Sequence, residues 1–146
     1  MVNIVQVGAG YWGKNLLRLF SELGVLCALV EPDNELAEKL STDFKVEVRT
    51  LDECLADDTV SAISFATPAE THALLAMQAL DAGKHVFIEK PLSLKIEDAE
   101  ALIQKADSEG LILMVGHLLQ YHPIFIHLKK IVEEKKIGNI KYIYSN

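Results

Sequence analysis

Short apolar runs alternate with longer amphipathic stretches along this 146-residue chain, and no other feature constrains its fold as tightly. The apolar runs fall at residues 3–7, 25–30, 46–48, 60–65, 85–88 and 111–115. Helical patterns occupy the stretches at 11–23, 34–40, 51–56, 70–82 and 96–108. Short, nearly continuous apolar strands separated by helices are typical of a parallel sheet that is covered on both faces. We therefore predict an α/β fold, a doubly wound parallel sheet of about six strands in the middle of three αβα layers.

The acidity of the chain is confined to one region. Asp and Glu number 21 against 14 Lys and Arg, which gives a formal net charge of −7. Residues 31–58 hold ten acids and three bases, so this region alone sums to −7, and the remaining 118 residues carry eleven of each sign. Nucleic-acid-binding proteins usually have a basic surplus, and acidic membrane surfaces attract basic segments. We therefore expect neither nucleic acid nor a membrane as a partner.

Several smaller signals predict a cytoplasmic protein. Hydrophobic residues make up 50% of the chain, and a domain of ~150 residues buries roughly 70% of its unfolded surface, so it needs no disulfide staples. Cys27 and Cys54 have no CxxC neighbour and no histidines at metal-ligand spacing, which favours reduced, mostly buried thiols. The N-terminus shows no secretory signal, and no uncharged apolar stretch approaches the ~18 residues of a membrane span.

A glycine motif lies between the first predicted strand and the first predicted helix. The segment GAGYWG fits GxGxxG, and its context of strand, turn and helix is the one that dinucleotide binding requires. In such a turn one glycine allows the tight bend, one lets the backbone approach a pyrophosphate, and one lets helix and strand pack closely. The helix N-terminus adds free N–H groups and a positive dipole. We predict that the cofactor-binding residues include Gly8, Gly10, Tyr11, Trp12 and Gly13.

An acid follows the second predicted strand. Glu31 lies 18 residues after Gly13, where a dinucleotide-binding fold places the carboxylate that accepts hydrogen bonds from the ribose hydroxyls. A carboxylate there repels a 2′-phosphate, and no Lys or Arg occurs at positions 32–35. The sequence therefore predicts that NAD(H) is preferred over NADP(H). The alternative is a packing turn followed by one more surface acid.

Three further polar segments follow predicted strands, at the strand ends where open α/β sheets bind ligands. They are Ala66-Thr67-Pro68 with His72, Glu89-Lys90-Pro91, and Gly116-His117. Together with GAGYWG they resemble the cofactor domain of the Gfo/Idh/MocA oxidoreductase family, over the whole chain. The block THALLAMQALDAGKHVFIEKPLS, which contains the EKP tripeptide, is the most specific part. GYWGKNL and GHLLQYHP look most like the sugar-nucleotide dehydrogenases of that family.

The resemblance implies a Rossmann domain that binds NAD(P), and it implies roles for individual residues. Lys90 matches a catalytic lysine beside the nicotinamide, where an ammonium orients the reacting sugar hydroxyl and stabilises negative charge on its oxygen. Cofactor-binding roles follow for the aromatic Trp12 beside the pyrophosphate, for Thr67 and Pro68 beneath the adenosine and pyrophosphate, for Glu89 (which with Pro91 shapes the Lys90 loop), and for His72 and His117 near the nicotinamide half.

Each of these residues also has a plainer interpretation. A single lysine after a strand is usually a solvated charge, His72 could be a helix-face histidine bonded to backbone, and Trp12 could be a core residue. His117, His122 and His127 lie five residues apart and do not share one helix face, so no metal site is expected.

The last part of the chain is predicted to leave the Rossmann domain. We expect that domain over residues 1–120, and over 121–146 a final helix at 123–136 followed by a short strand at 141–144 that enters a substrate domain otherwise absent. The family's second domain supplies an Asp-x-x-x-His motif, and no such motif occurs after the predicted Rossmann domain here, so the chain is expected to be incomplete for catalysis. The alternatives are a stand-alone, non-catalytic nucleotide-binding or interaction module and a nucleotide-free scaffold. Apolar residues in the last helix and tail predict self-association or a disordered tail.

Overall fold

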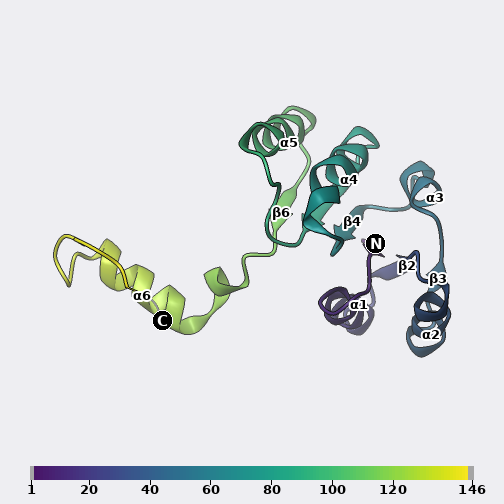
Figure 1. Ribbon diagram of the computed structural model, residues 1–146, viewed down its shortest axis with the longest axis horizontal. Helices are drawn as coiled ribbons and strands as arrows, with labels where there is room; N and C mark the ends of the chain where they lie inside the picture. The colour runs from purple at the N-terminus through teal and green to yellow at the C-terminus, as the bar shows by residue number, and fades with distance from the viewer. Residues whose placement is uncertain (1, 145–146) are drawn as a thin grey trace. The chain divides into compact units, whose positions relative to one another are not determined.

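The computed structural model describes residues 2–144 and consists of two compact units, Met1–Gly116 and His117–Asn146. The first unit holds a six-stranded parallel sheet of order β3-β2-β1-β4-β5-β6 (Figure 1). Its strands are β1 (Ile4–Val7), β2 (Leu26–Val30), β3 (Glu47–Val48), β4 (Ala62–Phe65), β5 (His85–Ile88) and β6 (Leu113–Val115). This is the doubly wound, Rossmann-type sheet that the alternation of apolar runs predicts.

Helices cover both faces of the sheet. They are α1 (Gly13–Glu22), α2 (Asn34–Phe44), α3 (Leu51–Ala56), α4 (Ala69–Asp81) and α5 (Ile96–Glu109). Figure 1 shows α1 and α2 on one side of the strands and α4 and α5 on the other. Local sequence fixes several helix ends: Asp33 caps α2 by accepting from Leu36 N–H, and Thr50 and Glu53 form a capping box at α3. Gly110 ends α5 at a φ of 66°, which favours glycine.

The core consists of two clusters of buried side chains, one on each face of the sheet. On one face, α4 and α5 pack against the central strands around Val5, Ile63, Phe65 and Leu80, all at most 1% exposed. On the other face, α1 and α2 pack around Leu17, Leu29 and Leu40. Because side chains alternate along a strand, β2 contributes Ala28 to the first cluster and Leu29 to the second, and the sheet is held rigidly between the two helix layers. This rigid sandwich fixes the positions of the loops at its carboxyl edge.

The second unit is small and mostly exposed. A short 3-10 helix, η1 (Leu118–Tyr121), precedes α6 (Pro123–Glu133), whose N-terminus is capped by His122 Nδ1 accepting from Ile124 N–H. The predicted strand at 141–144 is wrong: these residues form no strand. A strand needs a hydrogen-bonding neighbour, and residues 141–144 pair with none in the described part of the chain. No helix within residues 2–144 is both long and apolar enough to cross a membrane.

Candidate cofactor site at the carboxyl edge of the sheet

The glycine turn joins β1 to α1, and its three glycines stand in different surroundings. A Cβ at Gly13 would lie 2.1 Å from Gly8 O, so helix and turn approach too closely for any side chain. Gly8 has a φ of +79°, and a Cβ there would meet Ala66 O at 2.8 Å. A Cβ at Gly10 would meet nothing within 4 Å. The fold therefore requires glycine at positions 8 and 13, whereas position 10 faces open space where a pyrophosphate can approach the backbone.

Two side chains orient the turn. Glu31, at the end of β2, accepts from Ala9 N–H at 2.7 Å through one carboxylate oxygen and from Asp33 N–H at 3.1 Å through the other. Gln6, within β1 and fully buried, donates from Nε2 to Gly8 O at 2.8 Å. Gln6 is not among the residues predicted from the sequence, although a single amide among the apolar residues of NIVQV is a visible signal. A buried amide bonded to the turn carbonyl fixes the direction of the peptide that Glu31 contacts.

The two aromatic residues of the turn differ in what they contact. Tyr11 is 86% exposed, and Lys14 Nζ lies 5.7 Å from its ring centroid, so a cation stands next to the predicted phosphate position. Trp12 is 41% exposed, and its Nε1–H donates to Glu89 Oε1 at 2.7 Å. Trp12 is therefore not a core residue: its indole joins the glycine turn to the segment after β5.

The segment after β5 carries the predicted catalytic lysine. Glu89 is 8% exposed, its backbone N–H donates to Phe65 O at 2.9 Å, and its carboxylate lies against Gly116 after β6. Lys90 is exposed, and within residues 2–144 its ammonium makes no hydrogen bond or ion pair. A buried, bonded carboxylate next to an open ammonium leaves the lysine available to a ligand.

The loop after β4 is bonded to the same segment through His72. His72, in α4, is 1% exposed; its Nε2 lies 2.9 Å from Thr67 O and its Nδ1 lies 2.7 Å from Pro91 O. The plainer interpretation of a helix-face histidine bonded to backbone is thus confirmed, and its contact with a cofactor stays a prediction. Thr67 Oγ1 accepts from Thr71 Oγ1–H at 2.8 Å, and Pro68 precedes the first residue of α4.

The first unit therefore gathers the predicted turn, acid and loop residues at the carboxyl ends of β1, β2, β4 and β5. His117 is the first residue of the second unit, and its predicted role stays a prediction. Among residues 2–144, no group of three or more His, Cys, Asp or Glu side chains is arranged to hold a metal ion.

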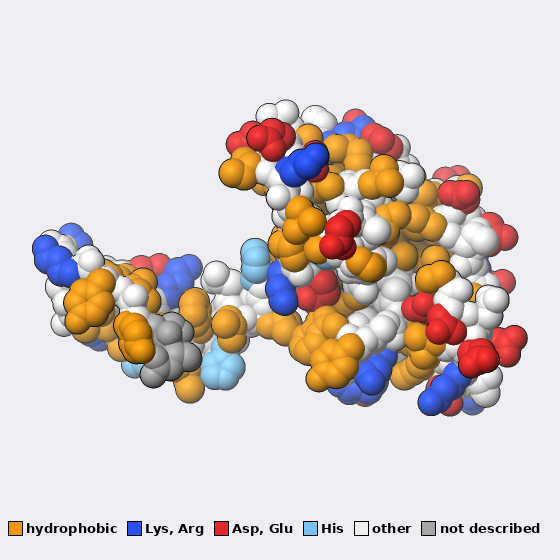
Figure 2. Space-filling model, in the orientation of Figure 1, with side chains coloured by type: hydrophobic (Ala, Val, Ile, Leu, Met, Phe, Trp, Pro, Cys, Tyr) orange, Lys and Arg blue, Asp and Glu red, His pale blue; other side chains and the backbone are white. Residues whose placement is uncertain are grey.

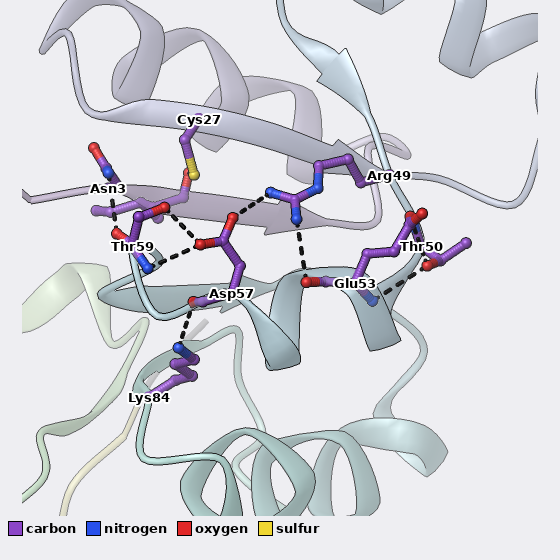
Figure 3. Close-up of polar contacts among 9 residues, drawn as sticks. Asn3, Cys27, Arg49, Thr50, Glu53, Asp57, Thr59 and Lys84 are labelled. Atoms are coloured by element: carbon purple, nitrogen blue, oxygen red, sulfur yellow. Dashed lines mark hydrogen bonds and ion pairs between the residues drawn. The ribbon is translucent and has the colours of Figure 1, made fainter.

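A second polar cluster lies beside the amino ends of β1, β4 and β5 (Figure 3). We call it the Asp57 cluster; its members are Asn3, Arg49, Asp57, Thr59 and Lys84. Asp57 accepts from Thr59 N–H at 2.8 Å, from Thr59 Oγ1–H at 2.7 Å and from Arg49 Nη1 at 2.9 Å. Its carbonyl oxygen accepts from the buried Lys84 ammonium at 2.7 Å, and Asn3 Nδ2 donates to Thr59 O at 3.0 Å.

Ionisation in and beside the Asp57 cluster follows from these contacts. The Thr59 hydroxyl and amide, with Arg49, lower the pKa of Asp57 to about 2, and the hydrogen bond to Asp57 raises the pKa of Arg49. Burial raises the pKa of the Cys54 thiol to about 11 and also raises that of Cys27. These groups hold their charges or protons firmly, which suits a structural role.

Sequence comparison places the chain among oxidoreductases. Residues 2–117 match the Gfo/Idh/MocA family model described as an oxidoreductase family with an NAD-binding Rossmann fold. The 2,7-anhydro-N-acetylneuraminate hydratase of Mediterraneibacter gnavus is 30% identical over 99% of this chain and 39% of its own length. The UDP-N-acetylglucosamine 3-dehydrogenase of Acidithiobacillus ferrooxidans is 31% identical over 85% of this chain and 39% of its own length. The chain thus spans about two fifths of the curated relatives it matches.

Structural comparison agrees. The crystal structure of GenD2 from gentamicin A biosynthesis, in complex with NAD, superposes with a TM-score of 0.86 and 33% identity. The match covers 92% of this chain and 40% of that one. The fold thus has a counterpart in a protein whose crystal structure holds NAD.

Proposed function

Because this chain belongs to the Gfo/Idh/MocA oxidoreductase family and carries its NAD-binding Rossmann domain, we propose that it serves a dehydrogenase acting on a hydroxyl of a sugar or sugar nucleotide. The observation that carries the proposal is the open Lys90 ammonium after β5, next to the bonded pair of Glu89 and Trp12. The cofactor would carry the hydride, and Lys90 would orient the hydroxyl and stabilise negative charge on its oxygen. A relative named for oxidation of UDP-N-acetylglucosamine supports this substrate class.

Residues along the carboxyl edge of the sheet can each be assigned to a part of the cofactor. We propose that the pyrophosphate meets Gly10, Tyr11 and Trp12, that Thr67 and Pro68 lie by the adenosine half, and that His117 belongs to the nicotinamide half. Gly10 supports this placement, because no atom of the described protein lies where its side chain would be. We further propose that the 146 residues bind cofactor without turning over substrate.

NAD(H) is proposed as the preferred cofactor because of Glu31. Two backbone N–H groups hold its carboxylate at the turn, where it would accept bonds from ribose hydroxyls and repel a 2′-phosphate. Glu31→Ala is expected to weaken NADH binding by about tenfold to a hundredfold, the range for hydrogen bonds to a charged group, and to narrow the gap to NADPH. Glu35→Ala, which removes an exposed acid of α2, is the matched control. An unchanged NADH-to-NADPH ratio in Glu31→Ala would contradict the assignment.

Calorimetric titration of the chain with NADH tests the proposed function directly. Trp12 is the only tryptophan, so its fluorescence gives a second signal from within the site. We expect saturable binding, its loss on Gly10→Leu, and no oxidation of UDP-N-acetylglucosamine by the chain alone. Absence of binding at millimolar NADH would refute the proposal, and turnover by the chain alone would refute its non-catalytic part.

We also propose that the chain self-associates through the apolar surface of its second unit. Ile124 is 73% exposed and Ile126 is 53% exposed on α6, and Figure 2 shows apolar side chains at the surface of this unit. Contiguous exposed apolar surface favours association. Light scattering should give a mass above that of the 16.2 kDa monomer, and Ile124→Lys should lower it. A monomer at high concentration would count against this.

A further inference from the structure

We propose that Glu89 and His72 are positioning residues that tie the Lys90 segment to the other two cofactor loops, so that the glycine turn and the Thr67 loop together set where the Lys90 ammonium stands. The expected effect on NADH binding rests on the proposed function. The contacts that form the tethers are independent of it.

The Glu89 tether runs to the glycine turn. Its carboxylate accepts from the Trp12 indole at 2.7 Å across 77 residues of sequence, and a charge-assisted bond of this kind is stronger than a neutral one. Gly116 closes the other side, because a Cβ there would lie 2.9 Å from Glu89 Oε1 and 3.1 Å from Cδ. A carboxylate that is 8% exposed, bonded on one side and packed against a backbone on the other has little freedom to turn.

The His72 tether runs to the Thr67 loop. One imidazole ring contacts Pro91 O at 2.7 Å and Thr67 O at 2.9 Å, so it bridges the loops after β4 and β5. The ring is 1% exposed, so its two nitrogen atoms are shielded from water. Since α4 packs on the sheet, His72 fixes both loops to the same rigid support.

The two tethers lie on opposite sides of Lys90 in sequence. Glu89 precedes it and Pro91 follows it, so the main chain on each side of the lysine is held while its own side chain is exposed. Neither tether contacts the ammonium; each acts through the backbone. Loss of either tether should let the ammonium move away from the nicotinamide half. The glycine turn and the Thr67 loop should keep the adenosine half in place, because each of them joins a strand directly to a helix, β1 to α1 and β4 to α4.

The first experiment tests the Glu89 tether without any ligand. The single tryptophan gives one indole N–H signal in an NMR spectrum, and the bond to Glu89 should slow its exchange with water. Glu89→Ala should speed that exchange by about tenfold or more, the factor that corresponds to one net hydrogen bond. Glu89→Gln, which keeps an acceptor oxygen, should recover part of the protection, and Glu100→Ala on the exposed face of α5 should have no effect. Equal indole exchange rates in wild type, Glu89→Gln and Glu89→Ala would overturn the tether. If Glu89→Ala does not fold, the test is the comparison of wild type with Glu89→Gln, and equal rates in these two would overturn the tether.

The second experiment separates positioning from general structural damage. Wild type and variants are titrated with NADH and with ADP-ribose, which lacks the nicotinamide. His72→Phe should lower NADH affinity by about tenfold and ADP-ribose affinity by less than about threefold, and His72→Gln should restore part of the difference. His127→Phe, at an exposed histidine of α6, should change neither. Equal losses for both ligands would assign His72 a merely structural role and overturn the proposal.

A Lys90→Ala background completes the test. If the tethers act through the lysine, His72→Phe should have little further effect on NADH affinity once the ammonium is removed. A full, additive loss would overturn the proposal. Should wild type bind neither NADH nor ADP-ribose, the proposed function fails, and the indole exchange still decides whether the Glu89 tether exists.

Discussion

The carboxyl edge of the sheet and the Asp57 cluster are both rich in polar side chains, yet they use their hydrogen-bonding capacity in opposite ways. In the Asp57 cluster, donors and acceptors satisfy one another: Asp57 receives three hydrogen bonds at its carboxylate and two at its carbonyl, from Lys84 Nζ and Val60 N–H. At the carboxyl edge, the bonds hold loops, while the Lys90 ammonium and the space beside Gly10 stay open. A cluster that satisfies itself contributes stability, and an edge that leaves groups open can bind a ligand.

Negative charge is also distributed unequally between the acidic region, residues 31–58, and the proposed binding edge. Acidic side chains gather over α2 and α3 in Figure 2, and they account for the net −7 of the chain. Glu31 is the one acid of this region that stands at the glycine turn, where it is bonded to backbone N–H groups. The proposed pyrophosphate position is at the glycine turn, where Lys14 Nζ lies by Tyr11, so the negative charge of the region is not concentrated where the pyrophosphate is proposed to bind.

The largest predicted effects come from the glycine turn. Gly13→Ala should destabilise the first unit by about 3 kcal/mol or more, because its Cβ would overlap Gly8 O, and NADH binding should be lost with the turn geometry. Gly10→Ala is the matched control for stability, since its Cβ meets nothing within 4 Å. Thermal unfolding and NADH titration of both variants check this: Gly10→Ala should unfold like wild type yet bind NADH more weakly. Equal melting temperatures for the two variants would contradict the structure of the turn.

Asp57→Ala should show the reverse pattern. Removing the carboxylate leaves Arg49 and Thr59 without their acceptor, so the melting temperature should fall by several degrees while NADH affinity stays at the wild-type value. Asp58→Ala removes an exposed neighbouring acid and serves as the control. If Asp57→Ala weakened NADH binding as strongly as it lowered the melting temperature, the division between a structural cluster and a binding edge would be wrong.

Features that depend on neighbouring residues could be predicted from the sequence, whereas contacts between residues far apart in the chain could not. The strands, the glycine turn and Glu31 are predictable, because apolar period, turn residues and caps act over a few neighbouring residues. The Trp12–Glu89 bond spans 77 residues and the Lys84–Asp57 bond spans 27, so both depend on the order and register of strands that no local pattern encodes. The wrong strand at 141–144 has the same cause: its residues suit a strand, but pairing depends on a neighbour elsewhere.

The Asp57 cluster should lose its contribution to folding stability at low pH. The pKa of Asp57 is lowered to about 2, so its bonds stabilise the folded state above the unfolded-state value near 4 and are lost as the pH falls toward 2. Urea unfolding followed from pH 5 to pH 2 should show wild-type stability falling more steeply than that of Asp57→Asn. Parallel curves for the two proteins would mean that Asp57 has the same pKa in the folded and unfolded states.

The smallest effect at neutral pH is expected at Cys54, which is fully buried beside the Asp57 cluster and whose pKa is raised to about 11. Because the folded state keeps this proton more tightly than the unfolded chain, its contribution to stability is present below about pH 9 and is lost as the pH rises toward 11. In a Cys27→Ala background, a thiol reagent at pH 8 should modify Cys54 about 100-fold more slowly than in denaturant, since burial and a small thiolate fraction both slow the reaction. Cys54→Val should remove the alkaline loss of stability and leave NADH affinity unchanged. Rapid modification of Cys54 in the folded chain would show that α3 moves away from the sheet. The Asp57 cluster and the carboxyl edge would then differ in flexibility as well as in hydrogen bonding.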